Sequence, residues 1–500
     1  MSALSQAGVL ICAFAGAALL LRRRLPCGEE DRLTRGDLAL GLTVALLVGA
    51  LATFWFGPLQ SGMTWGVRAS DFGEHCQAVV LAAEDIAHPH ISANRSRISA
   101  WLVSLAGEGP LDAFLTTAAL SYVVLAGALF AWGRTLHSRL AGVTTALLSL
   151  ALGPLVQLAR TLSFYPLFAA SFVVAAACVA WLARSRNAAV AGLCGVALGG
   201  IMLLGLRSLA WFLPLTVAAT LLCLGRPWRR VPLRLVALAL PIVLSFQLGT
   251  VAYSEDARSL ERLVNPSMRY NDMGIEGFEA RYSGTTHFVW GRTPLADLPG
   301  SVRTLATGVR PPMEVLWPHV RQGFGYYVLP WAPVLLSGLL AAFVALRGRP
   351  RRVLALGATV APFLLSGWGS ALMHVEPDRF VATAMPAVAL AGGLGLASIV
   401  QGAPGKASAL RPWWMGWVGA VALCVFGVVP SFLAPDASWR RVDPYPPGQM
   451  EVACYLHTAA GGDGVCLRLA NPHSPQCLSA LTEELDAGGT FWPVNAELAP

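Results

Sequence analysis

Twelve long apolar runs divide this sequence, and they constrain its fold more than any other feature. A helix needs about 20 predominantly apolar residues to cross the hydrocarbon core of a bilayer. We therefore expect an all-α polytopic membrane protein with about twelve transmembrane helices. The expected spans are 5–21, 37–56, 112–132, 140–159, 166–183, 188–206, 208–224, 232–251, 326–346, 353–373, 380–400 and 413–433.

The charge content excludes an ordinary soluble protein. Only 13% of the residues are charged and 55% are hydrophobic, and the mean hydropathy is +0.58. A typical soluble domain carries about 25% charged residues. The net charge of +8 therefore indicates the orientation of the chain in a membrane and not a nucleic-acid partner. The sequence contains no Walker motif, which argues against an ATP-driven pump.

Basic residues concentrate in every second short loop. The intervening short loops hold one arginine each, at Arg160, Arg207 and Arg379. Cytoplasmic loops carry an excess of Lys and Arg. This alternation predicts that both termini lie outside, in the bacterial inner (plasma) membrane. The basic set comprises Arg22, Arg23, Arg24, Arg32, Arg35, Arg134, Arg139, Arg184, Arg186, Arg226, Arg229, Arg230, Arg234, Arg347, Arg349, Arg351, Arg352, Lys406 and Arg411.

This orientation places three long polar segments on the outer side. They are the outer loops 57–111 and 252–325 and the tail 434–500. Loops of this length are more than connectors, and we expect both loops to contain helices that lie along the membrane surface. We expect a transmembrane domain at 1–433 and a small extracytoplasmic C-terminal segment. The four outer cysteines allow three complete disulfide pairings, among which the sequence does not choose: Cys76, Cys454, Cys466 and Cys477.

The first outer loop opens with candidate catalytic side chains. Glu74 and His75 follow Asp71 by three and four residues, so the three share one face of a helix. A carboxylate just outside the membrane is suited to act as a general base towards a hydroxyl. Asp71 followed by Glu74 is also the pattern of a helix N-cap with an acidic first turn. The two roles are compatible.

A second polar group follows in the same loop. This group comprises Glu84, Asp85 and His88. Its side chains are of the types that bind a divalent cation such as Mg or Mn, and one of its carboxylates could instead serve as a second acid. The alternative is a solvated turn ahead of Pro89.

Basic side chains recur where the chain re-enters the membrane. Arg321 lies in the aromatic stretch 311–327, and His374 and Arg379 flank a short turn between two apolar runs. Arginine binds phosphate well. Interfacial anchoring and snorkelling at a helix end are the alternatives.

The layout resembles the GT-C superfamily of integral-membrane glycosyltransferases, which includes the aminoarabinose and protein mannosyl transferases. The features that carry the resemblance are the span 37–56 leading into a long outer loop, Asp71 at its start, His88-Pro89 near its middle, the second long loop 252–325, and the late segment 374–397.

The resemblance implies a polyprenyl-phosphate-linked sugar as donor. It implies transfer to a lipid, glycan or protein acceptor on the outer face, in contact with membrane lipid, with Asp71 as the base and Arg321 and Arg379 on the donor phosphate. The next outer loop, 160–166, lacks the acidic residue that many members have there. A polysaccharide polymerase or ligase, a transporter or flippase, and a non-catalytic GT-C-like subunit are the alternatives.

Overall fold

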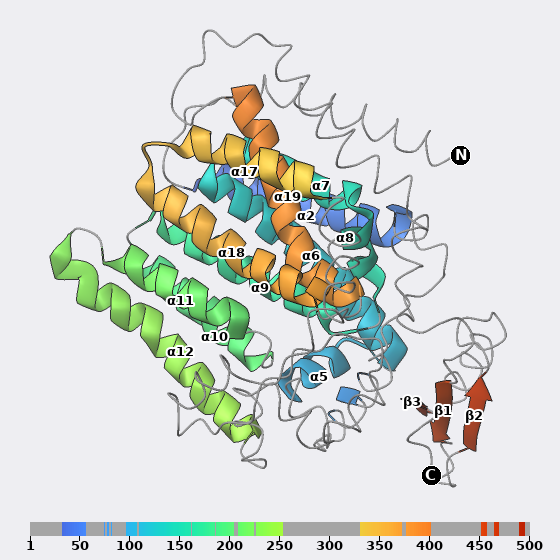
Figure 1. Ribbon diagram of the computed structural model, residues 1–500. Coiled ribbons are helices and arrows are strands. Elements are labelled where there is room, and N and C mark those ends of the chain that lie inside the picture. Colours follow the sequence, from blue (N-terminus) through green and yellow to red (C-terminus); the bar gives the residue numbers. More distant parts are fainter. Residues whose placement is uncertain are drawn as a thin grey trace, which may run out of the picture.

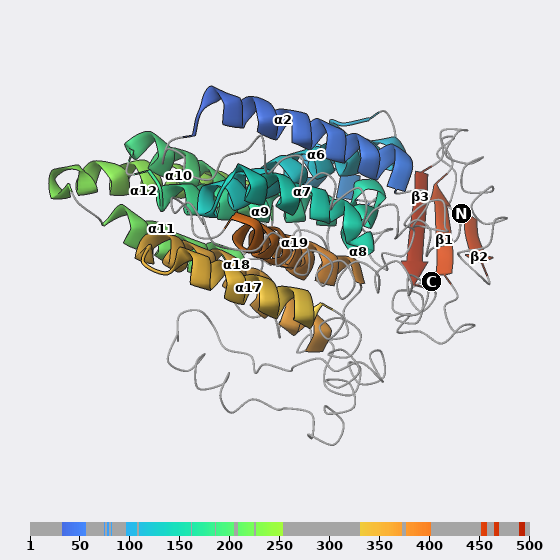
Figure 2. The ribbon, with the colours of Figure 1, turned by 90° about the horizontal axis from the view of Figure 1, so that it is seen from above.

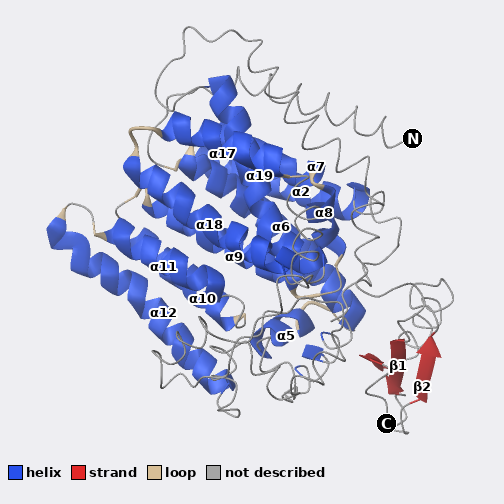
Figure 3. Cartoon of the chain, in the orientation of Figure 1, coloured by secondary structure: helices blue, strands red, loops and turns tan. Residues whose placement is uncertain are grey.

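The computed structural model of the chain is a bundle of helices with short strands in the C-terminal segment (Figures 1 and 3). The residues that the structure describes are 33–56, 75, 78–79, 82, 97–107, 110–161, 163–185, 187–204, 209–224, 227–253, 331–372, 377–401, 452–457, 465–469 and 490–495.

Apart from 140–159, the expected spans from 37–56 to 380–400 are helical in the described part of the chain. The expected spans 5–21 and 413–433 lie outside it, so the count of twelve stays a prediction. The helices are α2 (Arg35–Ala50, continued by the π-helix η1, Leu51–Phe56), α6 (Pro110–Leu136), α7 (Arg139–Ala151), α9 (Tyr165–Leu182), α10 (Ala188–Leu203), α11 (Leu209–Cys223), α12 (Val231–Tyr253), α17 (Ala332–Leu346), α18 (Pro350–Leu372) and α19 (Pro377–Gln401).

The expected continuous helix over 140–159 is wrong. The chain forms α7, then the short α8 (Gly153–Gln157) and the 3-10 turn η2 (Leu158–Arg160), with an extended Leu152 between α7 and α8. Proline fits the first turn of a helix but removes a hydrogen bond from its interior. Pro154 therefore lies in the first turn of α8, and α7 ends before it.

Burial places α9 and α19 in the interior of the bundle, together with α7, most of whose residues are buried. In the span Ala382–Gln401 of α19, 83% of the residues are buried, and in α9 72% are buried, against 39% in the span Arg35–Phe54. Figure 2 shows α2 along one side of the bundle and α17 and α18 along the opposite side, with α9 and α19 between them.

The outer faces of the bundle are apolar. Leu38 of α2 is 68% exposed, Leu233 of α12 is 60% exposed and Leu336 of α17 is 67% exposed, and each has exposed apolar neighbours on its helix. A soluble monomer rarely exposes apolar surface on this scale. Four described segments are also long and apolar enough to cross a bilayer: Arg35–Phe54, Ala113–Leu136, Tyr165–Leu182 and Ala382–Gln401. Both observations indicate an integral membrane protein.

The C-terminal segment contains an antiparallel sheet, which an all-α class does not anticipate. Its strands are β1 (Val452–His457), β2 (Val465–Leu469) and β3 (Thr490–Asn495), in the order β2-β1-β3. Pro493 lies in the edge strand β3, where a residue without an N–H group is tolerated.

Candidate functional site

Hydrogen bonds between helices show which helix ends lie together at the arginine-rich end of the bundle. Arg351, in the first turn of α18, donates from Nη2 to the carbonyl oxygens of Leu182 (2.9 Å) and Leu222 (2.8 Å), at the ends of α9 and α11. Ser138, between α6 and α7, donates to Oε1 of Gln401 at the end of α19 (2.6 Å). These bonds join, in two groups, the ends of helices that adjoin short arginine-bearing loops.

The first outer loop packs against the opposite helix ends. Ser99 of α5 (Arg97–Ser104) is buried and donates from Oγ to the carbonyl of Leu204 (3.0 Å), just after α10. The apolar side chains Trp101 and Leu105 are exposed instead. This orientation fits the expected surface helix, whose apolar face is directed away from the protein.

His75 anchors the start of the same loop. The ring is fully buried and stacks on Phe164, with 4.5 Å between centroids. Its Nδ1 accepts a hydrogen bond from the backbone N–H of Phe164 (3.3 Å), in the turn before α9. An accepting ring nitrogen carries no proton, so this bond selects the neutral tautomer with its proton on Nε2. His75 therefore joins the first outer loop to the start of α9.

Most of the side chains proposed from the sequence lie outside the described residues. These are Asp71, Glu74, Glu84, Asp85, His88, Arg321 and His374. The backbone of Arg379 is in the first turn of α19, and its side chain is not described. The described residue nearest to Asp71 and Glu74 in the sequence is His75. No group of three or more His, Cys, Asp or Glu side chains suited to a metal ion lies within the described ranges.

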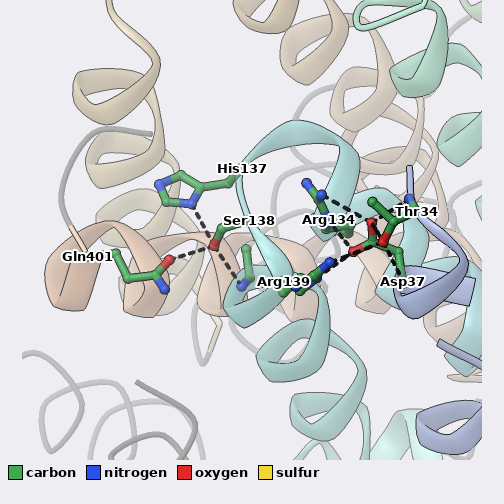
Figure 4. Close-up of polar contacts among 8 residues, drawn as sticks. Thr34, Asp37, Arg134, His137, Ser138, Arg139 and Gln401 are labelled. Carbon is green, nitrogen blue, oxygen red and sulfur yellow. Dashed lines mark hydrogen bonds and ion pairs between the residues drawn. The ribbon is translucent and has the colours of Figure 1, made fainter. Parts of the chain in front are cut away.

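A second polar cluster, at the arginine-rich end, is shown in Figure 4. Asp37 of α2 is buried at 2% exposure. Its Oδ1 accepts from Nε of Arg134 and from Nε of Arg139, each at 2.8 Å, and its Oδ2 accepts from Nη2 of Arg134 at 3.2 Å. Thr34 completes the cluster: its N–H and Oγ1 donate to Oδ2, and its Oγ1 accepts from the Asp37 N–H.

The bonding of Asp37 makes the cluster structural. Five hydrogen bonds occupy the two carboxylate oxygens, so no lone pair is left to take a proton from a substrate. The bonds instead tie the start of α2 to the end of α6 and the start of α7. Sequence reasoning missed this cluster, assigning Arg134 and Arg139 only to orientation. The spacing of Thr34 and Asp37, which is that of a capping box, was the available signal.

The neighbouring contact between His137 and Ser138 is not a nucleophile–base pair. Ser138 Oγ lies 3.1 Å from Nδ1 of His137, but its hydroxyl proton goes to Gln401. The same oxygen accepts from the Ala141 N–H (3.3 Å) as the N-cap of α7. The histidine is thus left to donate to this oxygen, and it does not activate it.

Comparisons by sequence find no relatives: no protein-family model matches the chain, and no curated protein matches it significantly. Comparison of the fold does find similar solved structures. The apo oligosaccharyltransferase of Archaeoglobus fulgidus is 15% identical, with a TM-score of 0.44, over 80% of this chain and 56% of that one. The same enzyme with an inhibitory peptide and a dolichol-phosphate gives a TM-score of 0.42 at 15% identity, over 81% and 56%.

ArnT from Cupriavidus metallidurans, bound to undecaprenyl phosphate, gives a TM-score of 0.40 at 16% identity, over 82% of this chain and 76% of that one. This chain spans a little over half the length of the archaeal enzyme.

Proposed function

We propose that this chain is a membrane glycosyltransferase, which moves a hexose or pentose from a polyprenyl-phosphate donor to a lipid, glycan or protein acceptor. The observation that carries the proposal is the anchoring of the first outer loop. His75 and Ser99 hold that loop against the helix ends opposite to the arginine-rich end. Asp71 and Glu74 precede His75 by four residues and one residue.

Asp71 acts as the general base in this mechanism, with Glu74 as its acidic neighbour. The acceptor oxygen attacks the anomeric carbon of the sugar, and the bond from that carbon to the phosphate oxygen breaks. The hydroxyl proton passes to the Asp71 carboxylate, and the polyprenyl phosphate leaves with the bonding electrons. Positioned general bases typically accelerate such proton transfers by about 10²–10⁴-fold.

Arg321, His374 and Arg379 bind the donor phosphate in this scheme. Guanidinium groups placed where negative charge develops stabilise the departing phosphate. Glu84, Asp85 and His88 are the proposed second acid or divalent-metal ligands. A lipid-linked donor explains how the chemistry proceeds without a nucleotide-binding motif.

The proposal is tested with the full chain in lipid nanodiscs. Undecaprenyl-phosphate-linked hexoses and pentoses are the donors, and a lipid and glycan extract is the acceptor. We expect Asp71→Asn to lower the transfer rate by about 10²-fold or more, while undecaprenyl phosphate binds as tightly as it does to the wild type. Arg379→Gln should weaken that binding.

Arg35→Gln, which alters an exposed arginine at the opposite end of the bundle, is the matched control and should change neither quantity. Unchanged turnover by Asp71→Asn would remove this residue from the mechanism. Failure of the wild-type chain to transfer any of these sugars, with no binding of undecaprenyl phosphate, would contradict the glycosyltransferase proposal itself.

A further inference from the structure

A rigid aromatic and basic turn precedes α12, far along the chain from the proposed catalytic residues. The 3-10 turn η4 (Trp228–Arg230) exposes all three of its side chains, and Trp228 is 63% exposed. Arg234, which is only 1% exposed, holds this turn from within. Its Nε donates to the carbonyl of Arg230 (3.2 Å), and its Nη2 donates to the carbonyl of Pro227 (3.1 Å).

The helix that follows fixes the depth of this turn in the membrane. Leu233, Val236 and Leu240 of α12 are each at least 55% exposed, and such apolar side chains belong in the lipid hydrocarbon. At a rise of 1.5 Å per residue, Leu233 begins only about 5 Å beyond the turn. The turn therefore lies at the level of the lipid headgroups, the depth at which exposed tryptophan is favoured.

The positive charge of the turn is uncompensated in the surrounding sequence. No Asp or Glu occurs between Asp112 and Glu255, or within 331–372, the segment that contains α18. Arg351 of α18 adds a further cation at this end of the bundle, bonded to the carbonyl of Leu222 in the last turn of α11. Exposed arginines in such a setting attract anionic lipids, by about 1 kcal/mol for each cation near the surface.

We propose that Trp228, Arg229 and Arg230 form a binding site for the headgroup of an anionic phospholipid, in the leaflet at the arginine-rich end of the bundle. The two guanidinium groups hold the phosphate, and the indole lies at the glycerol level. Arg234 pre-forms the site by fixing the backbone of the turn. This site is separate from the proposed donor site, because the first outer loop packs against the opposite helix ends.

The test measures binding of phosphatidylglycerol to the full-length purified protein by native mass spectrometry, with phosphatidylethanolamine as the zwitterionic comparison. We expect the double substitution Arg229→Gln/Arg230→Gln to weaken phosphatidylglycerol binding by about 30-fold, at about 1 kcal/mol for each arginine. Binding of phosphatidylethanolamine should not change. Arg229→Lys/Arg230→Lys should keep most of the preference for the anionic lipid.

The matched control is Arg35→Gln, an exposed arginine at the same end of the bundle but away from the turn. Equal losses in the control and the double variant would overturn the proposal in favour of diffuse charge attraction. Full retention of phosphatidylglycerol by the double variant would overturn it outright. Displacement of the lipid by millimolar inorganic phosphate would instead assign the turn to a free anion.

Discussion

At the scale of single residues, the Asp37 carboxylate accepts five hydrogen bonds from groups on three residues. The carboxylate forms ion pairs with Arg134 and Arg139, which lie about a hundred residues further along the chain. Taking one partner from a buried ion pair leaves the other charge uncompensated. The start of α2 thus depends on a charge balance with α6 and α7, and not on the helix propensity of its own sequence.

We expect Asp37→Ala to destabilise the protein by about 3–5 kcal/mol, because it removes the carboxylate that forms an ion pair with the buried Arg134. Thr34→Ala removes the cap and the hydroxyl bonds to Asp37 and Arg139 but leaves both ion pairs in place, and it should cost about 1 kcal/mol. Unfolding of the purified variants in mixed micelles, measured by titration with a denaturing detergent, gives the comparison. Equal losses for the two variants would show that the cap, and not the ion pairs, fixes this end of α2.

His75 offers a second test at this scale, because two substitutions separate its two contacts. His75→Phe keeps an aromatic ring against Phe164 but leaves a buried N–H group without an acceptor, at a cost of about 1–3 kcal/mol. His75→Asn keeps an acceptor near the position of Nδ1 but loses the stacking. We expect faster amide exchange in a peptide containing Phe164 for His75→Phe than for His75→Asn. The reverse order would show that stacking alone holds the loop.

The sequence predicted the helices better than it predicted the contacts between distant residues. The apolar runs and the arginine alternation are local patterns, so they predicted most helices and the residues that share the arginine-rich end. The partners of Asp37 were not predictable in this way, because hydrophobic periodicity carries no information on which distant arginine meets a given carboxylate. The sequence predicted that His75 shares a helix face with Asp71. It did not show that the His75 ring would stack on Phe164. Asp71, Arg321 and the other proposed site residues remain sequence predictions.

At the scale of elements, small residues decide how closely the helices approach. A Cβ atom added to Gly195 of α10 would overlap the backbone carbonyl oxygen of Leu238 in α12. A Cβ atom added to Gly199, one turn later, would overlap the side chain of Ser245 in α12. In a bilayer, where lipid is as apolar as leucine, such close approach is a main source of helix association. The spacing of these glycines therefore joins α12, and the turn before it, to the bundle.

We expect Gly195→Ala to destabilise the chain by about 1–3 kcal/mol, because the obstructing atom belongs to the backbone and cannot rotate away. Gly200 provides the matched control on the same helix, since a Cβ at that position meets nothing within 4 Å. Gly200→Ala should be neutral or stabilising by up to about 1 kcal/mol, from helix propensity. The same detergent titration measures both, and a loss of stability in Gly200→Ala equal to that of Gly195→Ala would rule out the packing explanation.

At the scale of the whole molecule, the direction of each helix links the two ends of the bundle to two compartments. The ties among Arg351, Leu182 and Leu222, and between Ser138 and Gln401, gather arginine-bearing helix ends. The tie between Ser99 and Leu204 gathers the opposite ends with the first outer loop. A single orientation in the membrane therefore sets the compartment of the proposed catalytic loop and of the lipid site together.

Accessibility labelling tests this orientation with single cysteines in a cysteine-free background. Gly107→Cys reports on the exposed end of the first outer loop, and Arg35→Cys and Arg347→Cys report on exposed positions at the arginine-rich end. The excess of arginine predicts that a membrane-impermeant thiol reagent labels only Gly107→Cys in intact cells, and labels all three after permeabilisation. Labelling of Arg35→Cys and Arg347→Cys alone in intact cells would place the first loop inside. The donor for the proposed transfer would then lie on the cytoplasmic face, because the hydrogen bonds between helices fix both ends of the bundle in one orientation.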